Sequence, residues 1–215
     1  MEAKKSLKAA AACALSVAML FAGAACGTSD GSDDAASSDS GSKSSELTGY
    51  DVSSVQKDDD IAKLLPDYVT KDNKLTIGMD TSYAPAEFLA EDGKTPVGFD
   101  VDIAKALAQV FGLEADPETA NFDSIIPSVG SKYDIGISSF TVTKERLEAV
   151  DFVSHFDAGS AWAVKKGNPN KIDVSDLCGK KVAVQTATMQ EAEANKMAKQ
   201  CEADGKDKLE VISSK

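Results

Sequence analysis

The sequence lacks the residues on which most catalytic and metal-binding sites depend. It has one histidine, His155, and four cysteines among 215 residues. It has no glycine-rich phosphate-binding loop and no cluster of metal ligands at recognisable spacing. We therefore expect no metal site, no cofactor and no catalytic residue. His155 ends an apolar stretch where no activated nucleophile is indicated, so we interpret it as a structural or surface residue.

Positive charge is also scarce. The chain carries 23 Lys and Arg against 35 Asp and Glu, which gives a net charge of -12. This balance excludes a nucleic-acid-binding protein, which needs a basic face to displace counterions from phosphate. It also excludes docking on anionic lipid by electrostatics alone. The hydrophobic content of 42% is ordinary for a soluble globular protein, and the length suits one large domain or two small ones.

The N-terminus has the pattern of an export signal. Lys4, Lys5 and Lys8 are followed by an apolar, alanine-rich run that reaches Ala25. A basic start, an apolar run and small final residues are typical of such signals. The alternative is a membrane anchor, but the run is slightly short for a bilayer and consists mostly of alanine. We predict that residues 1–25 form an export signal.

A cysteine directly follows this run. The small residues before Cys26 resemble the lipobox of bacterial lipoproteins, although that motif prefers leucine where Gly23 stands. The resemblance implies a lipid on Cys26, which would anchor the chain to the outer face of the cell membrane. Residues 26–56 are rich in Ser and Asp, and we expect them to form a flexible tether. A disordered tail without a purpose is the alternative.

Two cysteines lie in the C-terminal part of the chain. Cys178 precedes an expected strand and Cys201 follows an expected helix, and a strand followed by a returning helix would bring the two together. An even pair in an exported chain predicts a disulfide. Closing a loop of this length would contribute roughly 3 kcal/mol to stability under the chain-entropy model. Two buried free thiols are the alternative.

Strands alternate with helices after the tether. The expected strands are 74–79, 115–119, 134–138, 162–164, 181–184 and 209–212, and the expected helices or helical turns are 58–69, 100–111, 122–129, 143–149 and 188–200. We expect Asp100 to cap its helix, Gly112 to end it, and Pro117 to interrupt the strand that follows. The alternation predicts an α/β fold with a mainly parallel sheet. It restarts late in the chain, so we expect lobe 1 at residues 57–165 and lobe 2 at residues 166–215.

Arg146 is the only arginine in the chain. A solvated charge can be either lysine or arginine, whereas a flat, two-pronged donor to a carboxylate has to be arginine. Before it lie the hydroxyl-bearing residues Ser138, Ser139, Thr141 and Thr143, between an expected strand and a helical turn. Open α/β sheets bind ligands beyond the carboxyl ends of their strands. The alternative is a surface arginine that pairs with a neighbouring glutamate.

A second polar group follows the strand at 74–79. Asp80 could accept from an ammonium group, and Tyr83 could stack on a ligand. The alternative is an ordinary loop in which Asp80 caps backbone groups. Phe122 and Phe140 could be ligand walls, but each alone is more often a core residue.

Residues from about 61 to 212 resemble the extracellular substrate-binding proteins of polar amino-acid ABC transporters. The matching segments are LTIGMDTSYAPAEF (75–88), GFDVDIAKALA (98–108), FDSIIPSVGSKYDIGISSFTVTKER (122–146) and CGKKVAVQTATMQEAEA (178–194). The resemblance implies a two-lobe periplasmic-binding-protein type II fold, which closes on its ligand at a hinge. It also implies a site. Arg146 would grip the α-carboxylate of an amino acid with help from Thr141 and a backbone N–H near Thr188.

In the same comparison, Ser139 and the Ser138 carbonyl would meet the α-ammonium group. Asp80 and Tyr83 would face the ligand side chain, and Phe122 would line the pocket. Because Asp80 would repel an acidic side chain, we expect a basic or polar amino acid. The implied protein is a monomeric, lipid-anchored receptor that hands its ligand to an ABC transporter permease. The alternatives are an amino-acid-sensing domain, an enzyme similar to the cyclohexadienyl dehydratases, and a remnant that binds nothing.

The sequence departs from the family pattern in two places. The family usually has glycine before the threonine of lobe 2, whereas Ala187 precedes Thr188 here. The family also carries a later acidic residue for the α-ammonium group and a second hinge strand that returns to lobe 1. On this comparison we expect the chain to be C-terminally truncated, with lobe 2 and the return strands incomplete.

Overall fold

The computed structural model describes residues 49–215. The predicted export signal, Cys26 and most of the predicted tether lie outside the described residues. Within residues 49–215, no helix has both the length and the apolar character needed to cross a membrane.

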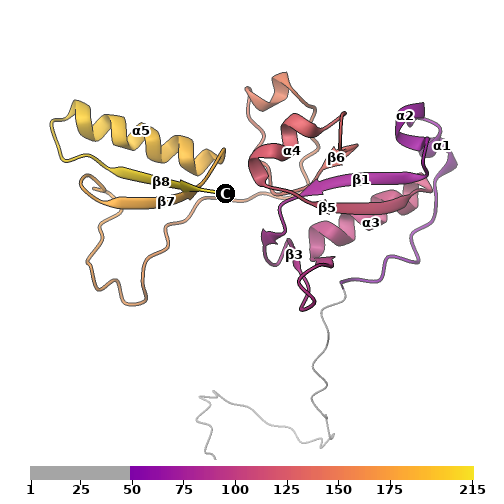
Figure 1. The fold of residues 1–215 in the computed structure, drawn as a ribbon, viewed down its shortest axis with the longest axis horizontal. Helices are drawn as coiled ribbons and strands as arrows, with labels where there is room; N and C mark the ends of the chain where they lie inside the picture. Colours follow the sequence, from indigo (N-terminus) through magenta and orange to yellow (C-terminus); the bar gives the residue numbers. More distant parts are fainter. Residues whose placement is uncertain (1–48) are drawn as a thin grey trace, which may run out of the picture. The chain divides into compact units, whose positions relative to one another are not determined.

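The larger sheet in the residues predicted as lobe 1 (57–165) has three strands in the order β5-β1-β6. The central strand β1 (Lys74–Met79) pairs in parallel with β5 (Glu114–Thr119) on one side and with β6 (Ile135–Gly136) on the other. The α/β fold with parallel strands is thereby confirmed (Figure 1). The predicted interruption at Pro117 is wrong, because Pro117 lies in edge strand β5, where one backbone side needs no ladder partner.

Helix α3 (Phe99–Phe111) covers this sheet. Its residues at helical spacing bury one apolar face against β1, and the fully buried members of this core include Leu75, Ile77, Met79, Val101 and Ala104. The helix ends at Gly112, as predicted, with a left-handed φ of 72°. The expectation that Asp100 caps the helix is wrong. Gly98 is the N-cap, and Asp100 lies fully buried inside the first turn.

Several short elements differ from the expected ones. The predicted helix at 58–69 is two helices, α1 (Asp59–Ala62) and α2 (Asp67–Thr70), because Pro66 stands at the N-cap between them. A small antiparallel sheet of β2 (Ser82–Tyr83), β3 (Glu87–Leu89) and β4 (Pro96–Val97) was not predicted. Helix α4 (Phe122–Ser128) forms near its expected place, and the turn at Arg146–Glu148 is a 3-10 helix, η1.

The strand predicted at 162–164 is absent from the described part of the chain. No described strand pairs with this segment, and a lone extended segment has no ladder to stabilise it. The segment leaves apolar side chains exposed, including Trp162, which is 47% exposed.

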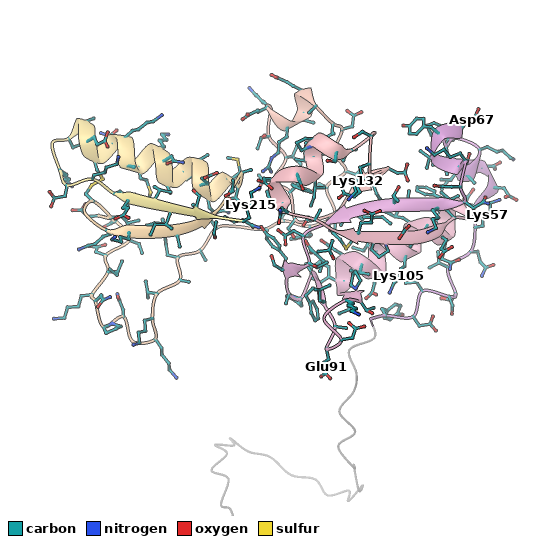
Figure 2. The ribbon with its side chains drawn as sticks, viewed as in Figure 1. Lys57, Asp67, Glu91, Lys105, Lys132 and Lys215 are labelled. Carbon is teal, nitrogen blue, oxygen red and sulfur yellow. A yellow bond between two sulfur atoms is a disulfide. The ribbon has the colours of Figure 1, made fainter. Side chains whose placement is uncertain are left out.

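The residues predicted as lobe 2 (166–215) form two parallel strands and one helix. Strand β7 (Lys181–Gln185) pairs with β8 (Glu210–Ser214), and α5 (Met189–Ala203) connects them. A disulfide joins Cys178 to Cys201, whose Cα atoms are 5.6 Å apart. Cys201 packs in a buried cluster with Leu177, Ala198 and Leu209. Lys215, labelled in Figure 2, follows β8 and forms a 3.2 Å ion pair with Asp123 of α4.

Candidate ligand-binding site

The parallel pairing of β1 with β6 brings two predicted site segments together. Asp80 directly follows β1, and Ser138 follows β6 by two residues. The carboxyl ends of parallel neighbours meet at one edge of a sheet, where such folds bind ligands. The Asp80 backbone N–H donates to Ser138 Oγ over 2.9 Å, which joins the two segments.

Asp80 is 8% exposed, and both oxygens of its carboxylate accept hydrogen bonds. Its Oδ1 accepts from the backbone N–H and the hydroxyl of Ser82, at 3.1 and 2.7 Å. Its Oδ2 accepts from the Phe122 backbone N–H at 3.2 Å and from Gln185 Nε2 at 2.8 Å. Asp80 therefore caps backbone groups of lobe 1 and also presents one carboxylate oxygen to a side chain of lobe 2.

Aromatic rings surround the arginine singled out from the sequence. The rings of Tyr83 and Phe122 have centroids 6.0 Å apart, and those of Phe122 and Phe140 have centroids 4.6 Å apart. The guanidinium carbon of Arg146 lies 5.6 Å from the Phe122 centroid and 5.7 Å from the Phe140 centroid. This range is that of cation–π contacts, which hold a flat cation against a ring face.

Within residues 49–215, the hydrogen bonds of the Arg146 guanidinium go to backbone carbonyls. Its Nη1 donates to the Thr141 carbonyl at 2.8 Å, and its Nη2 donates to the Ala187 carbonyl at 2.9 Å. The surface ion pair with Glu145 or Glu148 is not among the ion pairs found in residues 49–215. Burial lowers the pKa of Arg146, but a guanidinium stays protonated in proteins.

Gln185 is a site residue that sequence reasoning missed. It ends β7, and its Oε1 accepts a hydrogen bond from the Tyr83 hydroxyl while its Nε2 donates to Asp80. Burial raises the pKa of Tyr83 to about 12, with the Asp80 carboxylate adding to the effect, so the phenol keeps its proton as a donor. The strand-end rule that selected Asp80 also applies to the last residue of β7 and would have found Gln185.

The hydroxyl-bearing residues before Arg146 differ in how deeply they are buried and in which of their groups face the site. The Ser138 hydroxyl is buried and donates to Glu87 Oε1 at 2.7 Å, so only its carbonyl is left for the predicted contact. Ser139 has a left-handed φ of 52° and is half-buried. Thr141 is exposed and meets Arg146 through its carbonyl.

Beneath the site lies a pair of buried carboxyl groups that the sequence did not reveal. Glu87 and Asp100 are both 0% exposed, and each has one oxygen without a hydrogen-bond partner. Burial raises the pKa of Glu87 to about 8; the hydrogen bond from Ser138 opposes this, and the nearby Asp100 and Asp80 carboxylates add to it. Asp100 Oδ1 lies 3.0 Å from His155 Nε2, which gives the lone histidine a structural contact.

The N-terminus of α5 is capped by its own residues. The Thr188 hydroxyl accepts from the Glu191 backbone N–H at 3.2 Å, and Glu191 Oε2 accepts from the Ala187 N–H at 2.7 Å. Ala187 has a left-handed φ of 63°, a conformation that glycine adopts without strain. This backbone geometry explains the preference for glycine at this position in the family pattern.

Two cavities open among these residues. A cavity of about 650 Å³ is lined by Phe122, Phe140, Arg146 and Thr188, together with the first turn of α5. A second cavity of about 520 Å³ is lined by Asp80, its neighbours Thr81 and Ser82, and Thr119. Tyr83, Ser138, Ser139 and Thr141 line neither cavity. In the part of the chain that the structure describes, no group of three acidic, histidine or cysteine side chains could hold a metal ion.

These elements and their order form the type II periplasmic-binding-protein fold, as in the structurally similar proteins below. The chain belongs to the bacterial extracellular solute-binding proteins, family 3, whose pattern matches residues 75–211.

Individual relatives are amino-acid-binding proteins by name. The chain is 36% identical over 156 residues to the arginine-binding protein ArgT of Corynebacterium glutamicum, a match that covers 72% of this chain and 51% of that protein. An ancestral arginine-binding protein bound to arginine is similar with a TM-score of 0.59 and 38% identity, over 66% of this chain and 61% of that chain. An ancestral amino acid-binding protein, described as a precursor of cyclohexadienyl dehydratase, is similar with a TM-score of 0.60 and 34% identity, over 69% of this chain and 63% of that chain. The chain spans about half the length of the curated relatives it matches.

Proposed function

We propose that this chain captures a basic or polar amino acid outside the cytoplasm and delivers it to the permease of an ABC importer. The observation that carries the proposal is the setting of Arg146. Its guanidinium lies against two phenylalanine rings and lines the cavity of about 650 Å³. Within the described residues, its hydrogen bonds go to uncharged backbone carbonyls. A carboxylate would replace such a carbonyl with a charge-assisted, two-pronged contact.

The remaining assignments follow the charge pattern of an amino acid. Arg146, with Thr141 and a backbone N–H near Thr188, would bind the α-carboxylate. Ser139 and the Ser138 carbonyl would bind the α-ammonium group. A zwitterion that leaves water needs both charges matched, or the loss of hydration is uncompensated.

Asp80, Tyr83 and Phe122 would face the ligand side chain. Asp80 supplies negative charge, and Tyr83 supplies a hydroxyl donor beside the Phe122 ring. A cationic or amide side chain suits this set, whereas a carboxylate would meet the Asp80 charge. Closure of lobe 1 (57–165) on lobe 2 (166–215) would bury the ligand. The relatives named for arginine support a basic ligand.

We further propose that the protein acts as a monomer held at the outer face of the cell membrane by a lipid on Cys26. The apolar run and small residues before Cys26 support an exported, anchored chain. We propose a binding role without catalysis. The dehydratase alternative needs an acid–base carboxylate in the cleft. Among residues 49–215, the acidic side chain whose pKa is strongly raised is Glu87, and it is fully buried under Ser138.

Calorimetric titration with a panel of amino acids tests the proposed function. The protein should be the product of the complete reading frame, without residues 1–25 and with Cys26 replaced by serine. We expect saturable binding of arginine, lysine or glutamine, with glutamate bound at least about tenfold more weakly because of the Asp80 charge. Tightest binding of glutamate, or no binding of any amino acid, would contradict the proposal. Turnover of prephenate or arogenate would instead establish the dehydratase alternative.

A further inference from the structure

Gln185 connects lobe 2 to both polar groups that we assign to the ligand side chain. Its Nε2 donates to Asp80 Oδ2 over 2.8 Å, and its Oε1 accepts from the Tyr83 hydroxyl. Both partners belong to lobe 1, more than a hundred residues earlier in the chain. One side-chain amide therefore satisfies the acceptor and the donor of the proposed side-chain subsite at the same time.

The contact with Gln185 differs from the other hydrogen bonds of Asp80. The other donors to the Asp80 carboxylate are Ser82 and the Phe122 backbone N–H, which come from lobe 1 itself and hold the carboxylate in place. Without Gln185, one acceptor site on Asp80 Oδ2 and one donor on Tyr83 would have to find other partners. Asp80 is only 8% exposed, and a buried polar group that loses its partner carries a free-energy cost.

The neighbouring backbone makes a parallel contact at the other end of the site. The Ala187 carbonyl, two residues after Gln185, accepts from Arg146 Nη2 at 2.9 Å. The end of β7 and the residues just after it thus contact both Arg146, assigned to the α-carboxylate, and Asp80, assigned to the side chain.

We propose that Gln185 is an intramolecular occupant of the side-chain subsite, which an incoming amino acid must displace; the inference rests on the proposed function. The groups that Gln185 satisfies define what can displace it. A guanidinium or ammonium group donates to Asp80 as Gln185 does, and in addition its positive charge pairs with the carboxylate, which the neutral amide of Gln185 cannot do. A glutamine side chain can reproduce both bonds of Gln185. A carboxylate offers Asp80 no donor and is repelled by it.

Replacing Gln185 with leucine tests the inference, because leucine keeps the approximate volume and removes both hydrogen bonds. In calorimetry on the product of the complete reading frame, Gln185→Leu should bind arginine about three- to tenfold more tightly than the wild type, since the competing contact is gone. Unchanged or weaker binding would overturn the inference, and weaker binding would instead make Gln185 a direct partner of the ligand. Gln200→Leu is the matched control. Gln200 lies exposed on α5 and its side-chain amide donates to Asp204 Oδ1 at 2.7 Å, away from the candidate site, so this change should leave the affinity unaltered.

A second measurement separates this inference from the proposed function, because its first comparison needs no ligand. The side-chain amide of Gln185 can be assigned in a ¹H–¹⁵N NMR spectrum as the pair of signals that is lost in Gln185→Leu. Asp80→Asn should shift these signals in the absence of any amino acid, and arginine should shift them in the wild type. If Asp80→Asn leaves the chemical shifts of these signals unchanged, the inference is overturned, even if the wild type binds arginine. If Asp80→Asn shifts them but no amino acid binds the wild type, the contact stands and the proposed function fails.

Discussion

Arg146→Ala should lower the affinity for the preferred amino acid by about a hundredfold or more. Arg146 is the only arginine of the chain, and its guanidinium is held over Phe122 and Phe140 at 5.6 and 5.7 Å. Removing it would leave the ligand carboxylate in a partly buried cavity without a cation. Calorimetry with the amino acid that binds most tightly in the panel measures the effect.

Two further variants make the Arg146 result specific. Arg146→Lys keeps the charge but loses the planar, two-pronged donor, so we expect it to recover only a small part of the affinity. Lys144→Ala removes an exposed cation two residues away and should leave binding unchanged. If Arg146→Ala binds as tightly as the wild type, the carboxylate contact is assigned to the wrong residue.

Glu87→Gln should remove a pH dependence from the stability of lobe 1. Burial raises the pKa of Glu87 from its ordinary value of 4.5 to about 8, so the folded state keeps its proton where the unfolded state releases it. The stabilisation from this bound proton is fully present below pH 4.5 and is lost as the pH rises toward 8. Within that window the free energy of unfolding should fall by up to about 1.4 kcal/mol per pH unit because of this group.

Urea denaturation from pH 5 to pH 8 measures this effect as the difference between the wild type and Glu87→Gln. Glutamine stays uncharged and keeps an oxygen for the Ser138 hydroxyl, so the variant should lack the slope that Glu87 contributes. Glu91→Gln is the control, because Glu91 is exposed in a turn and is labelled in Figure 2. A difference between the wild type and Glu87→Gln that stays constant across this range would show that Glu87 is ionised in the folded protein.

The elements with strong periodicity could be predicted from the sequence. The apolar strand at 74–79 and the helical repeat that ends at Gly112 formed as expected, because their pattern already matched the face they bury. Proline was harder to interpret. Pro66 separates two helices, whereas Pro117 is accommodated in an edge strand, and only the order of the strands distinguishes the two cases.

Contacts that depend on tertiary structure could not be predicted. The segment at 162–164 has strand-like residues, but within the described chain it has no partner strand. Aspartate is a residue type that often caps helices, yet Asp100 is buried beside Glu87 and His155, because Gly98 occupies the cap position.

The residues of the candidate site also divide into those that the sequence analysis selected and one that it missed. Arg146 and Asp80 could be selected because residue type and position after a strand are visible in the sequence. Gln185 was missed although it ends a strand in the same way, and its two hydrogen bonds to residues of the other lobe are visible only in the structure. The roles of all these residues toward a ligand stay predictions.

The central claim is that the site recognises the carboxylate of an amino acid through Arg146. The most direct test is a titration of the wild-type, complete reading-frame product with its preferred amino acid and with the corresponding decarboxylated amine, such as arginine and agmatine. We predict saturable binding of the amino acid and at least about hundredfold weaker binding of the amine, because only the amino acid can engage the guanidinium. Equal affinity for the two compounds would contradict this account.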